Sequence, residues 1–194
     1  MKKNKSFDTK KLVLLALLTA IVVVLQWLAA VFPIFPFTLT LVLVPMVIGA
    51  ALIGPLAGGW LGLVFGAVVL LTGNANIFLV VNPVATIVVV LLKGILAGLA
   101  AGAVYKLLAE KSKNVATLCA AVVCPIINTG IFTIGAYLFF MPVVMGFTEF
   151  FGYESATAII FLGLVGINFP IELGINLVLS PIIVRLIQIS SKAT

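Results

Sequence analysis

Long apolar stretches, separated by short polar or glycine- and proline-containing connections, make up most of this chain. A helix needs about 20 apolar residues to cross the ~30 Å hydrocarbon core of a bilayer, because each residue adds about 1.5 Å. The pattern therefore predicts an all-α, polytopic membrane protein with a single domain over residues 1–194. We expect a bundle of six transmembrane helices, at residues 12–31, 39–53, 56–71, 84–108, 115–140 and 158–189.

Three of the expected helices depart from the standard spanning length. Residues 39–53 and 56–71 are short, so neighbouring helices are expected to shelter part of them. Residues 158–189 are too many for one straight membrane helix. Pro170 and Pro181 within that stretch predict kinks, because proline removes a backbone hydrogen bond and crowds the preceding turn.

The distribution of charge predicts the orientation of the bundle. Only 8% of residues are charged, 64% are hydrophobic, and the net charge is +6. With a cytoplasmic N-terminus, the connections at 53–58 and 106–114 and the C-terminus are also cytoplasmic, and the outer loops at 32–38, 72–83 and 141–157 contain no Lys or Arg. This is the positive-inside pattern, and it indicates a membrane partner rather than nucleic acid. The basic residues concerned are Lys2, Lys3, Lys5, Lys10, Lys11, Lys106, Lys111, Lys113, Arg185 and Lys192.

The residue types needed for common catalytic sites are missing or badly spaced. The chain has no histidine, no carboxylate pair at a spacing suited to acid–base catalysis, and no glycine-rich nucleotide loop. Cys119 and Cys124 lie inside an apolar run, where cysteine is usually a small buried residue. We therefore expect no enzyme activity, metal or cofactor, and any ATP hydrolysis that drives transport must occur on separate subunits.

Lys93 is the most unusual residue of the fourth expected helix. A charge at the centre of a bilayer costs about 2.5–3.5 kcal/mol on insertion scales, so it usually has a partner, a water-filled cavity or a ligand. Gly94, Gly98 and Gly102 follow at intervals of four and form one helix face. Small residues on one face allow another membrane helix to approach closely.

Asn128 and Asn168 fall at a depth similar to that of Lys93, and Glu172 lies about one turn deeper. With polar residues nearer the outer face, they predict a pocket that opens outward. Asn168, Glu172 and Asn176 recur at i, i+4 and i+8 and share one helix face. Aromatic residues available as pocket walls are Trp27, Phe35, Phe37, Phe78 and Tyr137. The candidate substrate-binding residues are Gln26, Asn74, Asn82, Lys93, Asn128, Asn168 and Glu172.

Each of these residues also has a purely structural interpretation. Lys93 and Glu172 could neutralise each other as a buried ion pair that fixes helix packing. Asn128 and Asn168 could be hydrogen-bonding links between helices, and Asn74 could be a turn former beside Gly73.

Two further groups of small residues are candidates for helix contacts. Ala16 and Ala20 lie one turn apart in the first expected helix. A second group surrounds the connection between the second and third helices, at Ala51, Gly54, Ala57, Gly58, Gly59 and Gly62. Both groups could pack within the bundle or dock a separate membrane subunit.

Several segments, in this order, resemble the substrate-binding S components of energy-coupling factor (ECF) vitamin transporters. They are the A-x-x-x-A step at Ala16 and Ala20, PMVIGAALIGPLAGGWLGLVFGAV from Pro45, KGILAG from Lys93, NTGIF from Asn128 and NFPIELGIN from Asn168. The resemblance covers essentially the whole chain and is greatest to the pantothenate-type members.

The resemblance implies a multi-pass subunit of the bacterial cytoplasmic membrane that binds one small vitamin near its outer face. The loops after the first and third helices would cover the vitamin. Ala16 and Ala20 would contact a transmembrane T subunit, and two ATPase subunits would supply energy. A carboxylate such as pantothenate would suit Lys93, through a charge-assisted hydrogen bond.

Other functions remain open from the sequence. The chain could play the same role for another vitamin or small micronutrient. It could instead be an autonomous secondary transporter in which Lys93 and Glu172 relay an ion or proton, or a purely structural membrane subunit that binds no ligand.

Overall fold

All secondary structure in the described residues, 9–31 and 41–192 of a computed structural model, is helical. The expected all-α class is therefore confirmed. The elements are α1 (Thr9–Val31), α2 (Leu43–Leu52), α3 (Pro55–Leu71), α4 (Asn76–Val81), α5 (Pro83–Leu108), α6 (Lys113–Phe139), α7 (Met141–Met145), α8 (Thr148–Phe151), α9 (Ala156–Ala158), the π-helix η1 (Ile159–Leu164) and α10 (Val165–Lys192).

Four helical segments in the described residues are long and apolar enough to cross a membrane, namely Thr9–Val31, Pro83–Leu108, Lys113–Phe139 and Ala156–Arg185. The helices α2 and α3 are apolar but shorter, with 10 and 17 residues. At about 1.5 Å per residue, α2 is roughly 15 Å long, about half the hydrocarbon core. The expected helix at 39–53 is therefore shorter than predicted, and residues 39 and 40 lie outside the described residues.

Two predicted loops contain helices instead. Residues 72–83 include α4, and residues 141–157 include α7, α8 and the start of α9. These segments are rich in apolar residues, which favours compact helical turns that cover the end of the bundle. The expected outer loop at 32–38, with Phe35 and Phe37, lies outside the described residues.

The last expected helix also differs from its prediction. It begins with α9 and the π-helix η1 before α10, and α10 continues as one helix through Pro170 and Pro181. A π-helical turn inserts an extra residue per turn and often occurs next to a functional site.

Local sequence signals explain where several helices begin. Asn82 caps α5 by accepting a hydrogen bond from the Ala85 backbone N–H at 3.0 Å, and Pro83 occupies the first turn, where no N–H is needed. Ser112 caps α6 in the same way through Val115, at 3.4 Å. Gly54 separates α2 from α3 with a φ of 133°, a conformation that other residues rarely adopt.

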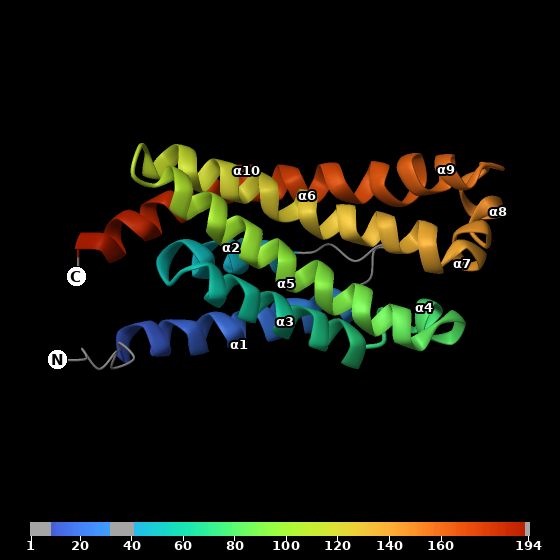
Figure 1. The fold of residues 1–194 in the computed structure, drawn as a ribbon, viewed down its shortest axis with the longest axis horizontal. Helices are drawn as coiled ribbons and strands as arrows, with labels where there is room; N and C mark the ends of the chain where they lie inside the picture. The colour runs from blue at the N-terminus through green and yellow to red at the C-terminus, as the bar shows by residue number, and fades with distance from the viewer. Residues whose placement is uncertain (1–8, 32–40, 193–194) are drawn as a thin grey trace.

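The bundle is elongated (Figure 1). Its two ends differ in charge. One end holds the start of α1, the α2–α3 junction, the α5–α6 connection and the end of α10, and we call it the basic end. It holds the described residues Lys10, Lys11, Lys106, Lys111, Lys113 and Arg185, whereas Lys2, Lys3 and Lys5 lie outside the described residues. The opposite end, which we call the cap end, is formed by α4, α7, α8 and α9.

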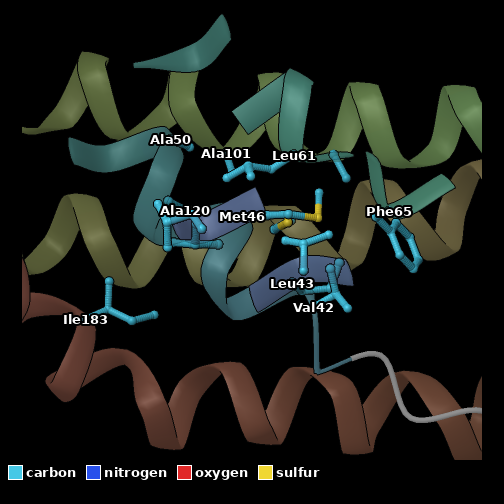
Figure 2. Close-up of a cluster of buried hydrophobic side chains, with 14 of the residues drawn as sticks. Val42, Leu43, Met46, Ala50, Leu61, Phe65, Ala101, Ala120 and Ile183 are labelled. Atoms are coloured by element: carbon cyan, nitrogen blue, oxygen red, sulfur yellow. The ribbon is translucent and has the colours of Figure 1, made fainter. Parts of the chain in front are cut away.

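The short helix α2 lies in the interior of the bundle. Val42, Leu43, Met46 and Val47 are fully buried. Figure 2 shows Leu43 and Met46 among side chains from α3, α5, α6 and α10. Because its neighbours surround α2, a length below that of the bilayer leaves little of its backbone facing lipid.

The glycine face of α5 packs against α3. A Cβ atom added at Gly62 would collide with the backbone oxygen of Gly94, and one added at Gly98 would collide with that of Gly58. The two backbones therefore approach so closely that only glycine fits. Of the two roles considered for the small residues near the α2–α3 junction, Gly58 and Gly62 serve packing within the bundle.

The small residues of α1 behave differently. Ala16 and Ala20 are both exposed, so the described residues leave this face of α1 uncovered. Between them, the Thr19 hydroxyl accepts a hydrogen bond of 3.2 Å from the Trp60 indole Nε1 of α3. This bond links α1 to α3 beside the uncovered face.

Candidate functional site

A partly enclosed cavity of about 160 Å³ lies in the half of the bundle nearer the cap end. This volume suits a small organic molecule rather than a peptide or nucleic acid. Its walls come from helices along the whole chain, and its lining residues are Gln26, Phe65, Val69, Asn74, Ala75, Ile77, Phe78, Val90, Lys93, Asn128, Thr129, Phe132, Phe147, Leu164, Val165, Asn168 and Glu172.

The ammonium group of Lys93 lies between two aromatic rings. Its Nζ is 5.4 Å from the ring centre of Phe65 on α3 and 5.6 Å from that of Phe132 on α6. Both distances fall within the ~6 Å range of a cation–π interaction, which stabilises a cation in a poorly solvated place. The glycine face explains how Phe65 comes so close, because α3 and α5 pack backbone to backbone just beside Lys93.

The polar residues of α10 form a connected series, as their spacing predicted. The amide Nδ2 of Asn168 donates to the Glu172 Oε1 at 3.3 Å, and the Asn176 Nδ2 donates to the Glu172 backbone oxygen at 2.9 Å. Glu172 is only 1% exposed, and its negative charge interacts electrostatically with Lys93. Lys93 and Glu172 thus give the cavity one positive and one negative group.

Two amide side chains complete the polar lining at this depth. Gln26 on α1 and Asn128 on α6 are 2% and 4% exposed. Within the described residues, the Oδ1 atoms of Asn128 and Asn168 are buried and accept no hydrogen bond. Buried polar atoms in folded proteins nearly always have a partner, so exceptions at a cavity indicate a place for water or ligand.

Six of the seven predicted binding residues line this cavity: Gln26, Asn74, Lys93, Asn128, Asn168 and Glu172. Asn82 does not line it. Its side-chain oxygen is engaged by the Ala85 backbone N–H at the start of α5, which is a structural role. A polar residue directly before Pro83 and an apolar helix is a sequence signal for a helix cap.

The apolar walls match the sequence prediction less well. Of the aromatic residues proposed, Phe78 lines the cavity, whereas Trp27 is 60% exposed and the Tyr137 hydroxyl pairs with Thr157 at 2.6 Å. Phe65, Phe132 and Phe147 also line the cavity and were not predicted from the sequence. Phe132 follows Asn128 by four residues, so helical spacing could have placed it on the same face. No comparable signal exists for Phe147, which lies between α7 and α8.

No group of three or more His, Cys, Asp or Glu residues that could hold a metal occurs among the residues with described positions. Cys119 and Cys124 are free thiols, and Cys124 is buried. The cavity presents one cation, one carboxylate, several amides and aromatic walls.

Comparison with known proteins gives one match. The model of the family described as "ECF transporter, substrate-specific component" matches residues 10–184. No curated protein and no solved structure matches the chain.

Proposed function

Since this chain belongs to the family of ECF transporter substrate-specific components, we propose that it captures pantothenate in the cavity that contains Lys93. Membership makes the chain the substrate-binding membrane subunit of an ECF importer rather than an enzyme. It works with a membrane T component and with ATPase components, which supply the energy. The resemblance found in the sequence is thereby confirmed at the level of the family.

The surroundings of Lys93 are the main support for an acidic vitamin as the substrate. The Phe65 and Phe132 rings stabilise its charge but do not use all three N–H donors of an ammonium group. A ligand carboxylate in this cavity would form charge-assisted hydrogen bonds, which are about twice as strong as neutral ones. The hydroxyl and amide groups of pantothenate would find partners among the Asn and Gln side chains.

We further propose that the basic end faces the cytoplasm of a bacterium and that the cavity loads from the outside. The concentration of Lys and Arg at one end supports this orientation. The T component would dock on the face of α1 that contains Ala16 and Ala20, because both are exposed while the glycines of α3 are already engaged with α5.

The first experiment is to purify the chain alone in detergent and identify co-purified small molecules by mass spectrometry. We expect pantothenate in amounts equimolar with the chain, and saturable binding when pantothenate is titrated into emptied protein by calorimetry. Recovery of a different vitamin would mean that pantothenate is not the substrate, but the chain would still be a substrate-binding subunit. A protein that binds none of a broad vitamin panel would contradict the proposal.

A second experiment separates the importer from an autonomous transporter. Cells that contain this chain with its T and ATPase partners should accumulate labelled pantothenate, and the chain without partners should not. Ala16→Leu and Ala20→Leu should abolish accumulation while leaving binding intact. Ala103→Leu, at an exposed position of α5, is the matched control. Uptake without the ATPases would favour an ion or proton relay through Lys93 and Glu172.

A further inference from the structure

The amide of Asn168 has its direction fixed by the residue it contacts. A carboxylate only accepts hydrogen bonds, so the Asn168 Nδ2 must face Glu172, as the 3.3 Å contact with Oε1 requires. The other end of the amide, Oδ1, is buried and accepts no hydrogen bond from the described residues. Asn168 therefore has an acceptor, Oδ1, that is available to a ligand.

Asn128 offers a second acceptor from the neighbouring helix α6. It lies on α6, one turn before Phe132, and both residues line the cavity. Its side chain is 4% exposed, and within the described residues its Oδ1 also accepts no hydrogen bond. An amide oxygen left without a donor in a poorly solvated site costs about 1–3 kcal/mol.

Lys93 supplies the complementary chemistry, because an ammonium group can only donate. The lining also contains Gln26, the Glu172 carboxylate and Asn74, whose Nδ2 is a buried donor that makes no hydrogen bond within the described residues. Beside these, three groups have complementary chemistry, namely a charged donor on α5 and two amide oxygens on α6 and α10. A ligand that satisfies all three must combine an anionic or strongly accepting group with at least two O–H or N–H donors.

We propose that Asn128 and Asn168 select for hydrogen-bond donors on the ligand, so that the transported class is a small carboxylate bearing at least two hydroxyl or amide N–H groups. This inference rests on the proposed function, in that the cavity is taken as the binding site. It goes further by excluding acids that lack such donors, however well they fit.

The expected selectivity is large, because a site built to hydrogen-bond a hydroxyl or N–H group strongly rejects an analogue without one. A ligand without these donors leaves the Oδ1 atoms of Asn128 and Asn168 buried and without a hydrogen bond in the complex. Enzymes with such sites reject the analogue that lacks the hydrogen-bonding group by about 10⁴- to 10⁵-fold. For two acceptors in a partly enclosed cavity, we expect at least about 100-fold.

The test titrates the purified full-length chain with four probes in the same detergent. Pantothenate carries a carboxylate and several donors, panthenol keeps the donors without the charge, and lipoate and nicotinate are carboxylates without hydroxyl or N–H donors. Pantothenate should bind most tightly, and lipoate and nicotinate should bind at least about 100-fold more weakly. Panthenol should fall between them.

The outcomes separate the inference from the function on which it rests. If lipoate or nicotinate binds as tightly as pantothenate, the selection for donors is wrong while the binding role stands. If no probe binds and no small molecule co-purifies, the proposed function fails and the inference falls with it.

A substitution at Asn128 tests whether this residue causes the selectivity. Asn128→Leu replaces the amide by an apolar group of similar size, so it should reduce the pantothenate-to-lipoate affinity ratio by about tenfold or more. Asn114→Leu, the same change at an exposed position of α6, should leave the ratio unchanged. An unchanged ratio in a folded Asn128→Leu protein would overturn the role of Asn128. The probe series on the wild type tests the inference even if this variant does not fold.

Discussion

The α3–α5 interface and the α10 wall of the cavity owe their geometry to different groups. Between α3 and α5, Gly62 meets Gly94 and Gly58 meets Gly98 through backbone atoms. Along α10, Asn168, Glu172 and Asn176 are joined by side-chain hydrogen bonds. The Gly58–Gly98 and Gly62–Gly94 contacts are made by backbone atoms, which cannot rearrange. The hydrogen bonds within α10 involve side-chain groups whose partners can change when a ligand enters.

The comparison shows how α5 can both pack closely against α3 and contribute a residue to the cavity. In α5, Gly94 is fixed against α3, and its neighbour Lys93 faces the cavity. Close packing thus fixes the position of the cation, while α6 and α10 supply the groups that adapt to the ligand. Substitutions in the two regions should therefore affect different properties, stability in the first and binding in the second.

The largest effect should come from filling the glycine contact. Gly98→Val places a branched side chain against the backbone of Gly58, so α3 and α5 must separate. Overpacking of this kind costs about 3 kcal/mol or more, since no flexible side chain can yield. We expect loss of the monodisperse peak in size-exclusion chromatography and a sharply lower thermal unfolding temperature in detergent.

Gly130 provides the matched control for this prediction. A Cβ atom there meets nothing within 4 Å, although Gly130 is also inside a long helix. Gly130→Ala should be neutral or stabilise α6 by up to about 1 kcal/mol, through helix propensity. A Gly98→Val protein as stable as wild type would mean that the α3–α5 contact is not what holds these helices together.

The second effect should fall on both binding and stability. Lys93→Met removes the ammonium group but keeps an unbranched apolar side chain between Phe65 and Phe132. Loss of a charged hydrogen-bond donor should weaken pantothenate binding by about 1.5–3 kcal/mol, or roughly 10- to 150-fold. The unfolding temperature without ligand should fall, because the Glu172 carboxylate stays buried after the positive charge that interacts with it is removed. A protein that unfolds earlier but binds normally would assign Lys93 to packing.

The third effect is a gain in pantothenate affinity instead of a loss. Glu172→Gln keeps an oxygen that can accept from Asn168 but removes the negative charge near Lys93. An anionic ligand should then bind more tightly, by up to about 1 kcal/mol, because repulsion from the carboxylate is lost. Calorimetric titration with pantothenate and with neutral panthenol checks this, and only pantothenate should respond. A weaker pantothenate affinity would mean that Glu172 itself binds the ligand.

The smallest effect should come from Asn82, the residue that the sequence suggested for binding and the structure assigns to a helix cap. Asn82→Ala removes the hydrogen bond to Ala85 at the start of α5 and should cost about 1 kcal/mol of stability. Pantothenate affinity should not change. A clear loss of affinity with unchanged thermal stability would return Asn82 to the binding site.

Much of the site could be predicted because few residues in this chain can interact with a polar ligand at membrane depth. Lys93, Asn128, Asn168 and Glu172 are conspicuous among apolar neighbours, and counting residues along each helix gives their depth. The i, i+4 spacing likewise predicted the contacts of Glu172 with Asn168 and Asn176. These inferences depend only on local geometry.

The features that were missed depend on tertiary structure. An apolar run such as residues 76–81 gives no sign of whether it is a loop or a short helix at the end of a bundle. Which phenylalanine lines a cavity depends on the rotation of each helix, and in α3 that rotation is set by the contact between Gly62 and Gly94. The interior position of α2 follows from its neighbours and could not be read from its ten residues.

The contact between Gly62 and Gly94 also bears on how such a protein could be re-engineered to carry a new cargo. Because α3 and α5 form a frame that tolerates no added atoms, a library of substitutions there would consist mostly of misfolded proteins. Changes confined to Asn128 on α6 and Asn168 on α10 would alter the recognition surface and leave that frame intact. The natural places to randomise are therefore two positions on two helices, with Lys93 kept as a fixed anchor for an acidic cargo.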